Sequence, residues 1–115
     1  MKRPMFYKLV GKLVVPCGDD VIAWCETLSV GKHVAVDVIG STAVSTVFLG
    51  LDSNWAAFIA GDNDAPPIVF ETMIFPTALW NYYQTRCSTW DQAINAQNSA
   101  VAHVRKVLRQ LPVPV

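Results

Sequence analysis

The sequence predicts an α+β fold: an N-terminal β-hairpin, a short helix, a three-stranded antiparallel β-meander and a long C-terminal helix packed on one sheet face. Two patterns support this prediction. Runs of β-branched residues bounded by turn residues fill most of the chain, and an apolar stripe at helical spacing follows them. With 115 residues, the chain fits one α+β domain, residues 1–115, with a radius of gyration of roughly 13 Å. Apolar residues make up 52% and charged residues 16%, a balance that excludes a disordered tail.

The first two elements are a hairpin and a short helix. The apolar runs Phe6–Val10 and Leu13–Val15 flank a Gly-Lys pair, which suits a two-residue turn between antiparallel strands. Asp19 or Asp20 can then cap a short helix that Gly31 closes. The apolar residues that recur along this helix are Val21, Ile22, Cys25 and Leu28, with Trp24 beside them.

Three strand candidates follow, at His33–Ile39, Val44–Leu51 and Ile68–Phe75. The first alternates, so its valines are expected on one side of the sheet: Val34, Val36 and Val38. The other two runs are apolar on both faces, which is typical of central strands. We therefore expect these two runs to pair in a meander.

The C-terminal helix has the clearest pattern in the chain. Thr89 and Gln92 form a capping box, and Ser88 with Asp91 offers the same pattern in a neighbouring register. The apolar stripe comprises Ile94, Val101, Val104, Leu108 and Leu111, widened by Ala93, Ala100 and Val107 and interrupted by the polar Gln97. Pro112 and Pro114 are expected to stop the helix.

Charge and hydropathy exclude several classes of function. Nine Lys and Arg residues balance nine Asp and Glu residues, so the net charge does not support binding to nucleic acid or to an anionic membrane. No run reaches the about 18 apolar residues of a membrane-spanning helix. Lys8, Gly11 and Lys12 interrupt the apolar segment that a signal peptide needs. The odd number of cysteines, three, agrees with a reducing compartment, so we expect a cytoplasmic protein.

Two long connections, 53–67 and 76–87, carry large apolar side chains that lie outside the predicted elements. These residues are Trp55, Phe58, Ile59, Trp80, Tyr82 and Tyr83. Trp and Tyr are enriched at binding hot spots, so the sequence predicts that these residues contact a partner. The alternative is that both loops fold over the sheet and complete the core.

Asp52 and Glu71 form a second candidate site, because one carboxylate ends a predicted strand and the other lies inside the next. Two adjacent carboxylates can share a proton or hold a divalent cation. In the alternative interpretation, Asp52 is a turn residue and Glu71 is hydrogen-bonded to backbone or to Arg86.

Other chemistry has little support in the sequence. Cys17 and Cys25 are too far apart for the close ligand pair of a zinc site with Cys87, His33 or His103. Phosphate-binding glycine-rich loops are absent. The sequence therefore predicts no catalytic residue, no metal and no cofactor.

Three segments are similar to a known family. Residues 44–52 read VSTVFLGLD, residues 66–75 read PPIVFETMIF, and residues 88–90 read STW, followed by Ala93. Over roughly residues 18–105 the chain resembles a family of short, uncharacterised phage and prophage proteins. The resemblance implies a phage-related origin and the cytoplasm of a host cell. The family often has His where this chain has Ser53 and Gln97, and its loop before Pro66 is shorter and less aromatic.

Together these observations favour a non-enzymatic accessory protein that binds a host protein and inhibits a defence or regulatory complex. Self-association through the same apolar surface, as a homo-oligomer, is also expected. The alternatives are a small enzyme or a ligand or metal binder that uses Asp52 and Glu71, and a minor virion component.

Overall fold

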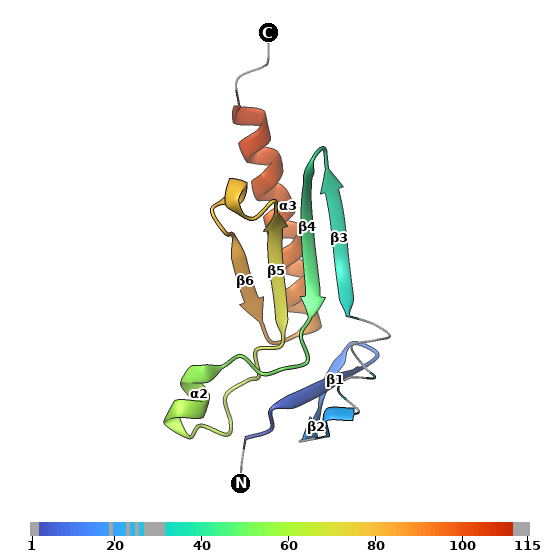
Figure 1. Ribbon diagram of the computed structural model, residues 1–115, viewed down its shortest axis with the longest axis vertical. Helices are drawn as coiled ribbons and strands as arrows, with labels where there is room; N and C mark the ends of the chain where they lie inside the picture. The colour runs from blue at the N-terminus through green and yellow to red at the C-terminus, as the bar shows by residue number, and fades with distance from the viewer. Residues whose placement is uncertain (1–2, 19, 23, 25, 27–31, 112–115) are drawn as a thin grey trace.

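A computed structural model describes residues 3–18, 20–22, 24, 26 and 32–111. It contains two antiparallel sheets, a hairpin and a four-stranded sheet of order β3-β4-β5-β6, with a long helix, α3, behind the larger sheet (Figure 1). The strands are β1 (Phe6–Val10), β2 (Leu13–Gly18), β3 (His33–Ile39), β4 (Thr42–Phe48), β5 (Phe70–Phe75) and β6 (Gln84–Cys87). The helices are α2 (Trp55–Ala60), the 3-10 helix η1 (Ala78–Trp80) and α3 (Trp90–Gln110).

The predicted α+β class and the hairpin are confirmed. Val10 pairs with Leu13 across the Gly-Lys turn, as expected. The predicted short helix lies partly outside the described residues, including Asp19, Cys25, Leu28 and Gly31. Its described helical residues are Val21, Ile22, Trp24 and Glu26.

The meander has a fourth strand that the sequence pattern did not predict. β6 pairs antiparallel with β5, from Phe70 opposite Cys87 to Met73 opposite Gln84. The prediction of three strands is wrong because β6 is a short, polar edge strand without apolar alternation. The central strands are also shorter than predicted: β4 ends at Phe48 and β5 begins at Phe70.

The helix face of the sheet is buried. Alternate residues of β4 and β5 point toward α3 and are buried there. They are Thr42, Val44, Thr46 and Phe48 on β4 and Phe70, Thr72 and Ile74 on β5. The matching residues of α3 are Ala93, Gln97, Ala100 and Val104.

The predicted cap of α3 is confirmed, but its buried face is rotated from the predicted stripe. Thr89 accepts from the backbone N–H of Gln92, and the Gln92 side chain accepts from the backbone N–H of Thr89. Leu108 and Leu111, predicted to be buried, are 37% and 55% exposed. The helix ends at Gln110, and the predicted stop residues Pro112 and Pro114 lie outside the described residues.

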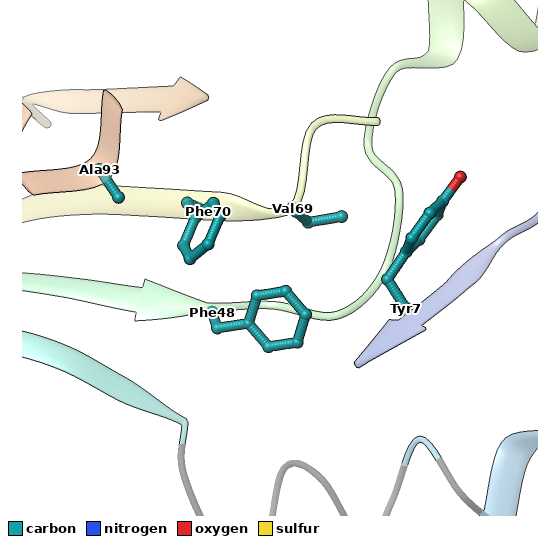
Figure 2. Close-up of a cluster of buried hydrophobic side chains, with 5 residues drawn as sticks. All are labelled: Tyr7, Phe48, Val69, Phe70 and Ala93. Carbon is teal, nitrogen blue, oxygen red and sulfur yellow. The ribbon is translucent and has the colours of Figure 1, made fainter. Parts of the chain in front are cut away.

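Within the described part of the chain, buried apolar residues form two clusters. One contains Val44, Ile74, Ala100 and Val104, midway along α3. Figure 2 shows the other, which joins β1, the facing ends of β4 and β5, and the start of α3. Its buried members are Tyr7, Phe48, Val69, Phe70 and Ala93.

The hairpin is attached to the chain segment that leaves β4. The Tyr7 N–H donates to the Gly50 carbonyl at 2.7 Å, and the Asp52 N–H donates to the Met5 carbonyl at 3.0 Å. Gly50 has a φ of +68°, and a Cβ at this position would lie 2.5 Å from the indole nitrogen of Trp24. Only glycine therefore fits this junction without a shift of its neighbours.

The second face of the four-stranded sheet carries no helix or strand among the described residues (Figure 1). We call it the open face. The strand register places its apolar residues at alternate positions: Val36, Val38, Ala43, Val47, Met73 and Phe75. A bulge between His33 and Ala35 separates Val34 from the other two valines, so the prediction that all three share a side is wrong. Val34 packs instead against the core cluster.

The molecule is longer than a compact chain of its length. Its radius of gyration is 16.3 Å, against the roughly 13 Å expected from the sequence. The principal extents are 61 × 31 × 22 Å. The hairpin and α2 lie beyond one end of the sheet, and α3 extends past the other (Figure 1).

Candidate functional site

The apolar residues predicted to contact a partner fall into two groups at opposite ends of β5 (Figure 1). The first group lies on α2, and the second on and just after η1. The groups are Trp55, Phe58 and Ile59, and Trp80, Tyr82 and Tyr83. The prediction that they lie outside regular elements is wrong for the first group and for Trp80. Asn54 caps α2 by accepting from the backbone N–H of Ala57, which explains how this short helix begins.

The α2 group is partly used within the molecule. Phe58 is half-buried, and the guanidinium carbon of Arg3 lies 5.4 Å from its ring centroid. Trp55 contacts Phe58 at 5.7 Å between ring centroids but is 52% exposed, and Ile59 is 89% exposed. Phe58 therefore covers a buried cation, while Trp55 and Ile59 face solvent.

The η1 group mainly completes the core. Tyr83 stacks on His103 of α3 at 5.5 Å, and Trp80 meets the same imidazole edge-on at 6.0 Å. Both aromatic residues pack against the cluster around Val44. Tyr82 is 69% exposed. For Trp80 and Tyr83, the structure agrees with the alternative in which the loops cover the sheet.

Asp52 is fully buried and is paired with Arg3. The Asp52 Oδ2 accepts from Arg3 Nε at 2.8 Å, and Arg3 Nη2 lies 2.8 Å from the same oxygen in the ion pair. The Asp52 Oδ1 accepts from the backbone N–H groups of Asn54 and Ile68. The remaining Arg3 donors bind the carbonyls of Asp62, Ala65 and Pro66. This network joins the N-terminal segment to both ends of the connection 53–67, which contains α2. The role of the ion pair is therefore structural.

Glu71 has partners of its own on the open face. Its Oε2 accepts from Arg86 Nε at 3.0 Å and from Gln84 Nε2 at 2.6 Å. Arg86 lies directly opposite Glu71 across the β5–β6 pair, which agrees with the alternative interpretation of this residue. Asp52 and Glu71 thus each pair with a different cation, Arg3 and Arg86.

A cavity of about 420 Å³ opens beside Glu71, at the end of the open face nearest α2. Residues that line it include Trp24, Trp55, Lys32, Glu71, Arg86 and Leu51. A second cavity, of about 370 Å³, lies between the hairpin and the start of α3. There the Lys12 ammonium lies 5.9 Å from the Trp90 ring centroid.

Cys17 and Cys87 are the two cysteines that the structure describes. Burial raises the pKa of the Cys87 thiol. Burial also raises the pKa of the Cys17 thiol, and the nearby Asp20 charge adds a smaller effect in the same direction. Both cysteines therefore favour the neutral thiol. Burial and the nearby Asp52 charge likewise raise the pKa of the Tyr7 phenol. Among the residues that the structure describes, no group of three or more His, Cys, Asp or Glu side chains is placed to hold a metal ion.

Two buried polar residues were not identified from the sequence as structural. Arg3 looks like a solvated terminal charge, and its partner is 49 positions away. Gln97 looks like an interruption of the helix stripe, yet its amide accepts from Thr46 Oγ1 and donates to Asp37 and to the Val44 carbonyl. A polar residue inside an apolar stripe was the available signal for Gln97.

Comparisons with protein-family models, with curated proteins and with solved structures found no match. The resemblance to phage proteins therefore stays a prediction. Within the described ranges, no helix combines the length and the hydropathy that crossing a bilayer requires.

Proposed function

We propose that this protein is a non-enzymatic binding module that docks a partner protein on its open face. The observation that carries the proposal is the exposure of apolar side chains there: Val36 is 53%, Val38 72% and Phe75 42% exposed. The solvent face of an antiparallel sheet is normally polar at these alternate positions. Contiguous exposed apolar surface of this kind marks interaction sites.

The ends of the open face add to the same surface. Trp55 borders the cavity at the end of β5 nearest α2, and its indole is a side chain enriched at interface hot spots. The ion pair between Glu71 and Arg86 provides a polar border, with Arg86 41% exposed. The resemblance to phage and prophage proteins implies that the partner is a bacterial host protein, and inhibition of a defence or regulatory complex is the role we propose.

A double variant, Val38→Lys with Phe75→Lys, tests the proposal in a quantitative pull-down from bacterial lysate. The matched control, Asn95→Lys with Ala102→Lys, adds the same charge at exposed positions of α3. We expect a specific protein to be captured by the wild type and the control and lost with the open-face variant. Equal capture by both variants, or none by the wild type, would contradict the proposal.

Light scattering of the purified proteins distinguishes whether the open face binds a different protein or a second copy of this chain. The homo-oligomer expected from the sequence is the alternative occupant of this face. A wild type that stays a monomer at micromolar concentration would leave the open face to a different protein. A dimer that the open-face variant alone dissociates would assign this face to self-association and overturn a host protein as its occupant.

A further inference from the structure

The cavity beside Glu71 has the size and lining of a small-molecule site. Its volume of about 420 Å³ falls in the lower part of the range of roughly 300–1,000 Å³ typical of ligand pockets. Such pockets combine apolar and aromatic walls with a few polar groups that fix the orientation of the ligand. Here Leu49 and Leu51 provide the aliphatic part, and the other described lining residues are two indoles, three charged groups and the hydroxyl of Ser53.

Each of the two indoles that line the cavity contacts a neighbouring ring. Trp24 contacts Phe6 at 5.2 Å between ring centroids, and its Nε1 donates to the Leu49 carbonyl at 3.3 Å. Trp55 contacts Phe58 at 5.7 Å. A side chain that neighbouring contacts already restrain loses less conformational entropy when a flat ligand stacks on its ring.

The charges at the cavity favour an anion. Glu71 is already neutralised by Arg86, which uses Nε for that contact. None of the described residues accepts a hydrogen bond from the terminal guanidinium nitrogens of Arg86, and none forms an ion pair with Lys32. Among the described residues that line the cavity, one carboxylate lies with two cations, so Lys32 and the Arg86 terminal nitrogens are available to an acidic group.

We infer that this cavity binds a small planar ligand that carries one acidic group, either a carboxylate or a phosphate. The ring stacks against Trp24 or Trp55, and the acidic group lies near Lys32 and Arg86. This site does not depend on a partner protein, so it goes beyond the proposed function. It uses Glu71 from the carboxylate pair considered above, without Asp52.

Two probes distinguish the sources of the acidic group. Adenosine 5′-monophosphate tests a nucleotide, with adenosine and inorganic phosphate as controls. Indole-3-acetate tests an aromatic carboxylate, with indole as its control. Isothermal titration calorimetry is expected to show that at least one acid binds about tenfold more tightly than its neutral control, and that added salt weakens it.

Variants connect the binding to this cavity. Trp55→Ala and Lys32→Gln change exposed side chains and are each expected to weaken binding of the acid about fivefold or more. Their controls, Tyr82→Ala and Lys12→Gln, change exposed residues outside the cavity and are expected to leave binding of the acid unchanged. Thermal melts of each variant confirm that it is folded. The inference is wrong if neither acid binds at millimolar concentration, or if binding survives both Trp55→Ala and Lys32→Gln.

Discussion

Arg3 and Asp52 form a buried ion pair that the sequence did not predict. Arg3 is 5% and Asp52 0% exposed, and backbone groups satisfy the rest of both side chains. Replacing a satisfied buried ion pair with apolar residues can be neutral, but removing one partner leaves an uncompensated charge in a desolvated site. The Phe58 ring over Arg3 limits the access of water that would otherwise reduce this cost.

Asp52→Asn is therefore expected to lower the free energy of unfolding by about 3–5 kcal/mol, measured by urea denaturation. Asparagine keeps an oxygen for the Asn54 and Ile68 N–H groups, so the loss reports mainly the missing charge. The control is Glu71→Gln, which breaks an ion pair whose arginine is 41% exposed and is expected to cost about 1 kcal/mol or less. A loss for Asp52→Asn no larger than that of the control would show that the buried pair contributes little.

At the scale of elements, a polar contact fixes how α3 lies on the sheet. Thr46 and Thr72 share a hydrogen bond of 2.6 Å on neighbouring strands, and Thr46 Oγ1 also lies 2.7 Å from Gln97 Oε1. Gln97 is 2% exposed and lies between the two apolar clusters. Because a shifted helix would leave these polar atoms unpaired, the contact favours one register of α3 along the sheet.

Gln97→Leu is expected to destabilise the protein by about 1–3 kcal/mol, because it leaves the Thr46 hydroxyl with one partner fewer in a buried site. Adding Thr46→Val and Thr72→Val removes the two hydroxyls while keeping similar shapes, although Asp37 and the Val44 carbonyl still lack the Gln97 donor. The triple variant is expected to recover part of the loss in thermal and urea unfolding. If the triple variant is less stable than Gln97→Leu alone, the polar contact is not the cause.

Sequence patterns predicted the elements that bury a regular apolar face. The capping box of Thr89 and Gln92 and the hairpin turn are local features, so they could be located without tertiary information. β6 and α2 were missed because each is short and takes its stability from neighbours: β6 from pairing with β5, and α2 from its Asn54 cap and the Arg3 network beside it.

For the candidate site, the sequence pointed to individual residues but not to how they lie together. Trp55 and Glu71 border one cavity, although the sequence grouped Trp55 with Trp80 and Glu71 with Asp52. Trp55 and Trp80 lie apart because α2 precedes the strand β5 and η1 follows it, at the opposite end of that strand. Which strand ends meet, and which distant charge pairs with which, depends on chain topology rather than on spacing along the sequence.

At the scale of the whole molecule, one glycine joins the hairpin to the sheet. Gly50 accepts from Tyr7, and a Cβ there would meet the Trp24 indole at 2.5 Å and the Tyr7 carbonyl oxygen at 3.0 Å. Gly40, in the β3–β4 turn, has a similar φ of +60°, but a Cβ at that position would have no neighbouring atom within 4 Å among the described residues. The two positions thus differ in crowding but not in backbone conformation.

Gly50→Ala is expected to cost about 1–3 kcal/mol more than Gly40→Ala, because both are strained by a positive φ and only the first is crowded. Chemical denaturation of the two variants measures the difference. Hydrogen exchange of β1 amides shows whether the added loss comes from release of the hairpin. Equal costs for the two substitutions would mean that the junction adapts without strain.

The elongated outline has a consequence for experiments on this protein. A chain of 12.7 kDa with a longest extent of 61 Å diffuses more slowly than a sphere of the same mass. On a gel-filtration column calibrated with globular standards, a monomer would elute early and give an apparent mass above its true one. The stoichiometry of any complex therefore has to be determined by a method that does not assume a round particle.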